Sequence, residues 1–246
     1  MSAKVRADQL LVAHGLAESR TRAQALILAG NVFVGEKRVA KAGDLLAEDA
    51  ELSVKGRDHP WVSRGGIKLD YGLTHFGFDV GGSVALDVGS STGGFTDVLL
   101  SRGAAKVYAV DVGTNQLAWK LRQDPRVVVH EQTNARSLDE SIIPEKVDIV
   151  VCDASFISLA KVLEAALRLA KPGARLLALV KPQFEAGREE VGKGGVVRDP
   201  AVHQRVCDEA SAWVASQGWT VLGVTESPIT GPEGNKEFLL GATKNG

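Results

Sequence analysis

Residues 86–96 read Leu-Asp-Val-Gly-Ser-Ser-Thr-Gly-Gly-Phe-Thr and complete an apolar run that begins at residue 84. This stretch predicts a strand, a glycine-rich turn and the start of a helix. Gly89 permits a tight turn, and Gly93 and Gly94 would let a ligand approach the backbone. Two serines interrupt the dinucleotide spacing G-x-G-x-x-G, and no Lys-Ser/Thr pair follows as in a phosphate-binding loop. We therefore expect a ligand-binding turn of another kind.

Outward from this turn, apolar runs of strand length alternate with helical patterns. The predicted strands are Val84–Val88, Lys106–Val110, Val127–His130, Val147–Cys152, Arg175–Val180, Thr220–Val224 and Phe238–Ala242. The predicted helices are Gly94–Ser101, Leu159–Leu169 and Pro200–Ser216. This alternation predicts an α/β fold with a mostly parallel, doubly wound sheet and helices on both faces. A hairpin-like break at 227–236 predicts that the last strand is antiparallel.

The first 57 residues have the pattern of a separate small α+β unit. A helical pattern at Arg6–His14 is followed by a second one that Ser19 can cap. Alternating valines around Gly35 predict a hairpin, and Leu52 and Val54 predict a last short strand. A unit of this size has a marginal core and usually carries a binding surface. We expect domains at residues 1–57 and 63–246, joined by a linker at 58–62.

Charge and composition restrict the classes of function. The net charge is −1, which excludes a uniformly basic nucleic-acid binder, but residues 1–57 carry +2 and the remainder −3. No apolar run approaches the roughly 18 residues of a membrane helix, and the start of the chain lacks the apolar core of a signal peptide. With only two cysteines, we expect a cytoplasmic protein with no membrane partner and no disulfide scaffold.

A local basic surface remains possible on the first unit. Its basic residues are either ordinary solvated charges or, as a group, a face that grips phosphates. The candidate RNA-binding residues are Arg6, Arg20, Arg22, Lys37 and Arg38, together with Arg64 ahead of the first strand of the sheet.

A second acid supports a nucleoside ligand at the glycine-rich turn. Asp111 ends the next strand, about 20 residues downstream, where it could bond both hydroxyls of a ribose. Asp87 would repel a pyrophosphate and suits a ligand with a positive amino group. Together they favour S-adenosylmethionine over NAD as the cofactor. The predicted cofactor-binding residues are Asp87, Gly89, Ser90, Ser91, Gly93, Gly94, Phe95, Asp111, Asn134 and Asp153.

Four ionisable residues occupy positions that the predicted fold could bring to one edge of the sheet. Asp153 and Lys181 follow two apolar strands, Lys68 precedes the first strand of the sheet, and Glu237 opens the last one. Their positions alone are consistent with a pair of ordinary salt bridges or with a catalytic group, and no metal-ligand spacing accompanies them.

The order of motifs resembles a known family. Residues 60–243 resemble the FtsJ-type ribose 2′-O-methyltransferases, whose Lys-Asp-Lys-Glu tetrad matches Lys68, Asp153, Lys181 and Glu237. Residues 4–55 resemble the αL-type RNA-binding domain of a small-subunit ribosomal protein. The whole chain resembles the TlyA family of rRNA methyltransferases, also called haemolysins. The match is carried by SRGGIK at 63–68, DVGSSTGGFT at 87–96, DASFIS at 153–158, KPQFE at 181–185 and KGGVVRD at 193–199.

The resemblance implies a fold, a cofactor and a substrate. The fold would be a Rossmann-like, seven-stranded S-adenosylmethionine-dependent methyltransferase sheet. The reaction would be 2′-O-methylation of ribose, with cytidine as the nucleotide, in rRNA of assembled ribosomal subunits, with no metal. FtsJ itself has Ala-Ala-Pro where this chain has Ser-Ser-Thr in the cofactor turn.

Several roles stay open at this point. Lys181 would act as the general base or would only orient the hydroxyl. Phe156, Phe184 and Trp61 are candidates for stacking on a base, or ordinary core residues, and residues 187–195 are expected to form a mobile lid. The alternatives in function are a membrane-active haemolysin, a non-catalytic RNA-binding or ribosome assembly factor, and a methyltransferase for small molecules.

Overall fold

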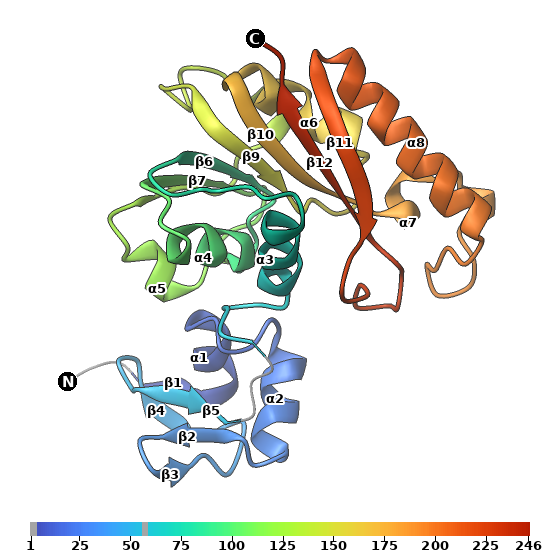
Figure 1. The fold of residues 1–246 in the computed structure, drawn as a ribbon. Helices are drawn as coiled ribbons and strands as arrows, with labels where there is room; N and C mark the ends of the chain where they lie inside the picture. Colours follow the sequence, from blue (N-terminus) through green and yellow to red (C-terminus); the bar gives the residue numbers. More distant parts are fainter. Residues whose placement is uncertain (1–3, 56–58) are drawn as a thin grey trace.

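The computed structural model describes residues 4–55 and 59–246. Figure 1 shows two bodies, a small one that carries the first seven elements and a large one built around a twisted sheet. We refer to them as the small domain and the large domain. The predicted boundary at residues 57 and 58 lies outside the described residues.

The small domain pairs two helices with short strands. Its elements are β1 (Lys4–Arg6), α1 (Ala7–Ala13), α2 (Arg20–Leu28), β2 (Val32–Val34), β3 (Lys37–Arg38), β4 (Leu45–Ala47) and β5 (Leu52–Val54). Ser19 caps α2 as predicted, because its Oγ accepts a hydrogen bond from the backbone N–H of Arg22 at 3.2 Å. The predicted hairpin is confirmed, since β2 pairs antiparallel with β3 and, on its other edge, with β5.

The large domain follows the predicted alternation of strands and helices. Its elements are α3 (Gly65–His75), β6 (Val84–Val88), α4 (Gly94–Ser101), β7 (Lys106–Val110), α5 (Trp119–Arg122), β8 (Val127–His130), η1 (Ala135–Ser137), β9 (Val147–Cys152), α6 (Leu159–Arg168), β10 (Ala170–Val180), α7 (Pro182–Glu185), η2 (Arg188–Glu190), α8 (Pro200–Ser216), β11 (Trp219–Glu226) and β12 (Phe238–Lys244). The α/β fold class is confirmed.

The sheet has seven strands in the order β11-β12-β10-β9-β6-β7-β8. β12 runs antiparallel to both of its neighbours, as predicted, and the pairs among β10, β9, β6, β7 and β8 are parallel. The chain order reverses direction across the sheet at β6 and β9, and open α/β sheets bind ligands outside the strand ends at such a point.

Alternate residues of each strand enter two separate cores. Val150 and Leu176 face one core, which also contains Leu163 of α6 and Val206 of α8. Ile149, Leu177 and others of opposite parity face a second core with Leu69 of α3 and Leu99 of α4. The period of two in a strand therefore places α3 and α4 on one face of the sheet and α6 and α8 on the other (Figure 1).

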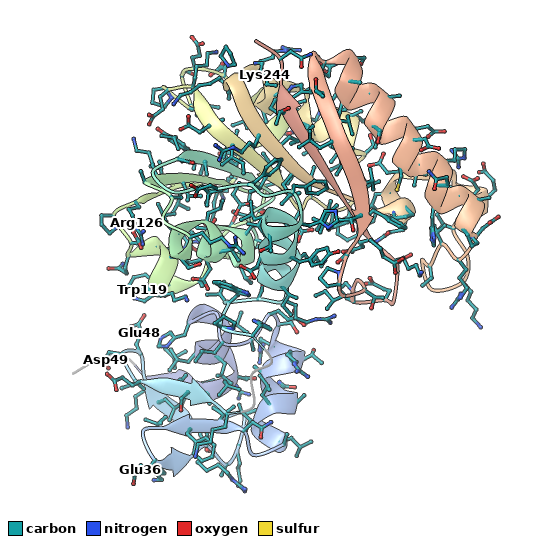
Figure 2. The ribbon with its side chains drawn as sticks, viewed as in Figure 1. Glu36, Glu48, Asp49, Trp119, Arg126 and Lys244 are labelled. Atoms are coloured by element: carbon teal, nitrogen blue, oxygen red, sulfur yellow. The ribbon has the colours of Figure 1, made fainter. Side chains whose placement is uncertain are left out.

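The two domains meet at the end of α1. Gly15 has a positive φ of 66°, and a Cβ atom there would lie 2.5 Å from the Cβ of Ala118 and 3.0 Å from that of Val62. Only glycine therefore permits this close approach. Figure 2 labels Trp119, the next residue after Ala118, at the edge of the large domain that faces the small one. Within residues 4–55 and 59–246, no helix is both long and apolar enough to cross a membrane.

Candidate active site

A cavity of about 660 Å³ lies at the carboxyl ends of the central strands. The loops that follow β6, β9 and β10 line it, and the start of α3 and the loop between β11 and β12 close its other sides. Glu18 of the small domain also lines it. Loops from several strands therefore converge on one concave site, as is usual for ligand sites in open α/β sheets.

All four residues of the predicted tetrad line this cavity, and they form two ion pairs. Lys68 Nζ lies 2.5 Å from Glu237 Oε2, and Lys181 Nζ lies 2.5 Å from Asp153 Oδ1. Both lysine side chains are nearly buried, with 9% and 8% of their surface exposed. Exposed ion pairs contribute little and are common on surfaces, whereas buried lysines are rare and need a partner. Burial and convergence thus distinguish these pairs from ordinary surface salt bridges.

Lys181 has more than one partner at this site. Its Nζ also donates to Ser155 Oγ at 2.9 Å, so the loop after β9 holds the ammonium from two positions. Burial by itself would lower the pKa of Lys181, but the charge and hydrogen bond of Asp153, with a further contribution from Glu237, outweigh it and leave the pKa raised. In these surroundings Lys181 therefore holds its proton at neutral pH.

The helix that carries Lys68 lies unusually close to its neighbours. A Cβ atom at Gly66 would lie 2.3 Å from Cγ of Trp61, and one at Gly72 would lie 2.7 Å from a methyl group of Leu177. These two glycines let α3 pack tightly between Trp61 and the sheet, which brings Lys68 to the strand ends. Trp61 is thus a packing residue of α3, and it does not line the cavity.

The glycine-rich turn has the predicted conformation for a partly different reason. Gly89 has a φ of 79°, and a Cβ atom there would lie 3.0 Å from the backbone of Ala154. A Cβ atom at Gly93 would instead lie 2.3 Å from a methyl group of Leu121, and one at Gly94 would lie 2.2 Å from Ser63 Oγ. Gly93 and Gly94 therefore make room for neighbouring protein segments, which is a reason for glycine in addition to the predicted approach of a ligand.

The two acids near the turn differ in their surroundings. Asp87 is fully buried, and its Oδ2 accepts from Thr96 Oγ1 at 2.7 Å. Its Oδ1 has no hydrogen-bond partner among the residues that the structure describes. Burial raises the pKa of Asp87 to about 7. Asp111 is satisfied by backbone groups, because its carboxylate accepts from the N–H of Ser91 at 2.8 Å and of Gly113 at 2.7 Å. It fastens the turn after β6 to the end of β7.

The structure brings only part of the predicted cofactor set to the cavity wall. Gly89, Ser90, Ser91, Gly94, Phe95 and Asp153 line it, whereas Asp87, Gly93, Asp111 and Asn134 do not. Asn134 caps η1 by accepting from the N–H of Arg136 at 3.0 Å, and both residues line a separate hollow. Within residues 4–55 and 59–246, no group of three or more His, Cys, Asp or Glu is placed to hold a metal ion.

Comparison with known proteins places this site in a family. Residues 61–244 match the FtsJ-like methyltransferase family, and residues 5–52 match the S4 domain. The chain is 48% identical over 241 residues to the 16S/23S rRNA (cytidine-2′-O)-methyltransferase TlyA of Mycobacterium tuberculosis, covering 98% of this chain and 90% of that protein. The chain belongs to the TlyA family of FtsJ-like methyltransferases.

Other relatives agree over nearly the whole chain. YqxC of Bacillus subtilis, provisionally named an rRNA methyltransferase, is 50% identical over 240 residues, which is 97% of this chain and 85% of YqxC. A solved structure from Streptococcus thermophilus, provisionally named a hemolysin, is 43% identical with a TM-score of 0.77, covering 100% of this chain and 90% of that one. The predicted resemblance to the TlyA family is therefore confirmed, together with its small RNA-binding domain.

Two aromatic side chains, Phe156 and Phe184, line the cavity of this TlyA-family protein. Phe156 is 91% exposed and has a φ of 66°, a conformation that bulky residues rarely adopt. Its ring centroid lies 5.1 Å from that of Phe184, and both residues line the cavity. An exposed aromatic residue on a strained backbone occurs mostly at functional sites, where the surrounding structure maintains it. Stacking on a base by Phe156 and Phe184 therefore stays a prediction.

The predicted lid segment is fastened at one end. Residues 192 and 196 form an isolated bridge, and Val191, Gly194 and Gly195 line the cavity. The side chain of Asn235, only 1% exposed, accepts from the N–H of Val197 at 3.0 Å and donates to the carbonyl of Gly195 at 2.8 Å. Asn235 therefore ties this segment to the loop before β12, two residues from Glu237.

Replacing Asn235 with alanine should loosen this segment. The buried side chain of Asn235 loses both of its hydrogen bonds, and we expect the protein to lose about 2 kcal/mol of stability. Trypsin should cut faster after Arg188 and Lys193, and kcat/KM should fall about tenfold because the cavity wall is less ordered. Asn245→Ala, near the far end of β12, is the matched control. Equal cleavage rates in the two variants would contradict this role.

Breaking the buried ion pair of Lys68 and Glu237 should cost more stability than breaking an exposed ion pair of the same domain. Lys68→Ala leaves a carboxylate that is 2% exposed without its cation, so we expect a loss of about 3 kcal/mol of stability in urea unfolding. Adding Glu237→Gln should recover part of that loss without recovering activity. Lys236→Ala breaks an exposed pair with Glu226 and should cost less than about 1 kcal/mol. Equal losses of stability in Lys68→Ala and Lys236→Ala would show that the buried ion pair contributes no more to stability than the exposed one.

The candidate RNA-binding residues occupy four places. Arg6 and Arg20 meet at the buried carboxylate of Asp8. The others of the small domain are exposed, Arg22 on α2 and Lys37 and Arg38 on β3. Arg64 lines the cavity and donates to the carbonyl of Thr230 at 3.2 Å.

Sequence reasoning missed three polar residues that the structure places beside these groups. Ser155 lies two residues after Asp153, and Asn235 two residues before Glu237, so proximity to the tetrad was a usable signal for both. Asp8 lies two residues after Arg6, and an acid so close to a candidate phosphate-binding arginine was the signal there.

Proposed function

We propose that this protein transfers a methyl group from S-adenosylmethionine to the 2′-hydroxyl of a ribose, of cytidine, in ribosomal RNA. The observation that carries this proposal is the convergence of two buried lysine–carboxylate pairs on one cavity beside the glycine-rich turn. The 48% identical relative from Mycobacterium tuberculosis is named a 16S/23S rRNA (cytidine-2′-O)-methyltransferase, and this name supports cytidine as the nucleotide and rRNA as the substrate.

The cofactor site is proposed at the turn after β6. The free Oδ1 of Asp87 supports it, because a buried acceptor without a partner suits a ligand that brings an ammonium group. Ser90 and Ser91 line the cavity and offer polar groups. Asp111 lies behind this wall, where its carboxylate accepts from the N–H of Ser91, and it would exchange that backbone partner for ribose hydroxyls. When bound, S-adenosylmethionine supplies an electrophilic methyl group on a sulfonium, which is a good leaving group. Asn134 has the weakest support, since its side-chain oxygen caps η1 and the residue lines a separate hollow.

The protein's tasks are then to position the hydroxyl and to manage its proton. Lys181 holds its proton in these surroundings, which favours a role in which its ammonium donates to the hydroxyl oxygen and stabilises developing negative charge. The proton that the hydroxyl loses as it takes the methyl group would pass to the carboxylate of Asp153, which lies 2.5 Å from the same ammonium. Asp153 and Ser155 fix the direction of that ammonium. Lys68, neutralised by Glu237, adds a second fixed cation at the cavity wall.

The RNA would reach this cavity from the side of the small domain. We propose an RNA-binding domain at residues 1–57, a linker at 58–62 and a methyltransferase domain at 63–246. Phosphate contacts from the arginines and lysines of the small domain would set the register. Phe156 and Phe184 would stack on an unstacked base, because a ribose inside an RNA helix is poorly accessible. A substrate in ribosomal subunits would place the protein in the cytoplasm, and a monomer could act on it.

One experiment separates this proposal from its alternatives. Ribosomal subunits from a strain that lacks the gene are incubated with the protein and S-adenosylmethionine that carries a tritiated methyl group, and red cells are incubated with the same protein. Tritium in rRNA without lysis is the expected result. Lysis without transfer would favour a haemolysin, and binding to subunits without transfer would favour an assembly factor.

A further inference from the structure

In the small domain, the buried carboxylate of Asp8 holds two surface arginines in place. Asp8 is fully buried, and its two oxygens accept from Arg6 Nε at 3.0 Å and Arg6 Nη2 at 3.1 Å. Oδ2 also accepts from Arg20 Nη2 at 3.1 Å and from Gln24 Nε2 at 3.0 Å. Oδ1 accepts in addition from the backbone N–H of Gln9 at 3.0 Å. One buried acid therefore joins β1, α1 and the first turns of α2.

Only some of the N–H donors of Arg6 and Arg20 bond to Asp8. Their side chains remain 42% and 55% exposed, whereas the side chain of Asp8 is 0% exposed. A guanidinium has five donors, and Asp8 takes two from Arg6 and one from Arg20. The hydrogen bonds from Arg6 lower the pKa of Asp8 far below its usual range, so the acid remains ionised. Within residues 4–55 and 59–246, no further hydrogen bond holds the remaining donors of either guanidinium group, and they can bind an anion from solvent.

We propose that Asp8 is a positioning residue that holds Arg6 and Arg20 as a preformed clamp for RNA phosphate groups. This inference rests on the proposed function, since it requires an RNA substrate. Long side chains lose conformational freedom when they bind, and a carboxylate that already fixes them removes much of that cost. Guanidinium groups bind phosphate through paired N–H donors, so a fixed orientation also improves the geometry.

A positioning role for Asp8 and simple electrostatics predict opposite changes in RNA affinity when Asp8 is replaced. Asp8 is an anion close to the place where phosphates would bind, so charge alone predicts that its removal strengthens binding to RNA. Positioning predicts that its removal weakens binding, because Arg6 and Arg20 become free to adopt other rotamers. Asp8→Asn keeps the shape of the side chain but places an amide among donors that require an acceptor.

The test compares Asp8→Asn with Asp49→Asn, which removes an exposed acid from the same domain (Figure 2). Binding to ribosomal subunits from a strain lacking the gene is measured by filter binding at several salt concentrations. We expect Asp49→Asn to bind as well as the wild type or better, and Asp8→Asn to bind about tenfold more weakly. In methyl-transfer assays Asp8→Asn should raise KM and leave kcat and the affinity for S-adenosylmethionine within twofold. A merely structural role would not give this division.

Two further arms keep the test decisive. If Asp8→Asn does not fold, as judged by thermal melting, the single variants Arg6→Met and Arg20→Met and their double variant replace it. A clamp predicts that each single variant loses most of what the double variant loses, and additive losses would overturn the inference. Wild-type-like or tighter binding by a folded Asp8→Asn would also overturn it. Failure of the wild type itself to bind subunits would instead count against the proposed function.

Discussion

Replacement of Lys181 with alanine is expected to lower methyl transfer at least about 100-fold while the affinity for S-adenosylmethionine stays within twofold. The ammonium of Lys181 is held by Asp153 and Ser155 at the centre of the cavity wall, so its loss removes the group that contacts the hydroxyl in the proposed mechanism. Rates with ribosomal subunits and calorimetric binding of the cofactor separate the two effects.

A matched control for this variant lies on β10, the strand that Lys181 follows. Lys171→Ala removes a lysine that pairs with Asp148 at 2.7 Å, but that pair is partly exposed and lies away from the cavity. We expect it to retain full activity. Turnover in Lys181→Ala like that of the wild type would remove Lys181 from the mechanism.

The pH dependence of kcat distinguishes the two roles of Lys181. Because its neighbours raise its pKa above the ordinary value, the ammonium form persists throughout the neutral range. We therefore expect kcat at saturating cofactor to change less than about twofold between pH 7 and pH 9. A rate that rises about tenfold per pH unit in this interval would instead assign proton removal to neutral Lys181.

Asp87→Asn is expected to weaken the binding of S-adenosylmethionine and to stabilise the fold at the same time. The pKa of Asp87 is about 7 in the folded protein, above its ordinary value of 3.8, because burial disfavours the charged form. A raised carboxyl pKa means that the folded state binds the extra proton. The stability that this proton contributes is complete below pH 3.8 and is lost as the pH rises through about 7.

The variant removes that loss, since asparagine stays neutral and still accepts from Thr96. We expect the stability advantage of Asp87→Asn over the wild type to be larger at pH 8 than at pH 5.5 by about 2 kcal/mol, because the wild type loses the contribution of this proton between these two pH values. Cofactor affinity should fall at least about tenfold at pH 8, because the ammonium of the ligand loses a buried carboxylate. Wild-type affinity should rise as the pH passes 7, and that of the variant should not.

Thermal melts and calorimetry at pH 5.5 and pH 8 measure both effects. Asp208→Asn on α8 removes an exposed acid of the same domain and should change neither quantity. Unchanged cofactor affinity in Asp87→Asn would separate this acid from the cofactor site.

The strands of the sheet were predictable because continuous apolar runs of four to six residues between turn residues are typical of buried parallel strands. The short elements were not, since β1 and β4 have three residues each and depend on pairing with one another. The packing role of Gly93 and Gly94 could not be predicted from the sequence, because Leu121 and Ser63 come close to them only in the folded chain. The four tetrad residues were found, yet the partner of each lysine depends on side-chain geometry at the sheet edge.

In the proposed mechanism a ribose is methylated in this cavity, and Lys181 is required for the transfer. Nucleoside mass spectrometry tests it on rRNA of subunits from the deletion strain, after incubation with S-adenosylmethionine that carries a deuterated methyl group. With the wild-type protein the label should appear on the ribose of cytidine, and with Lys181→Ala it should be absent. Label on a base, or equal label on ribose with the variant, would contradict the account.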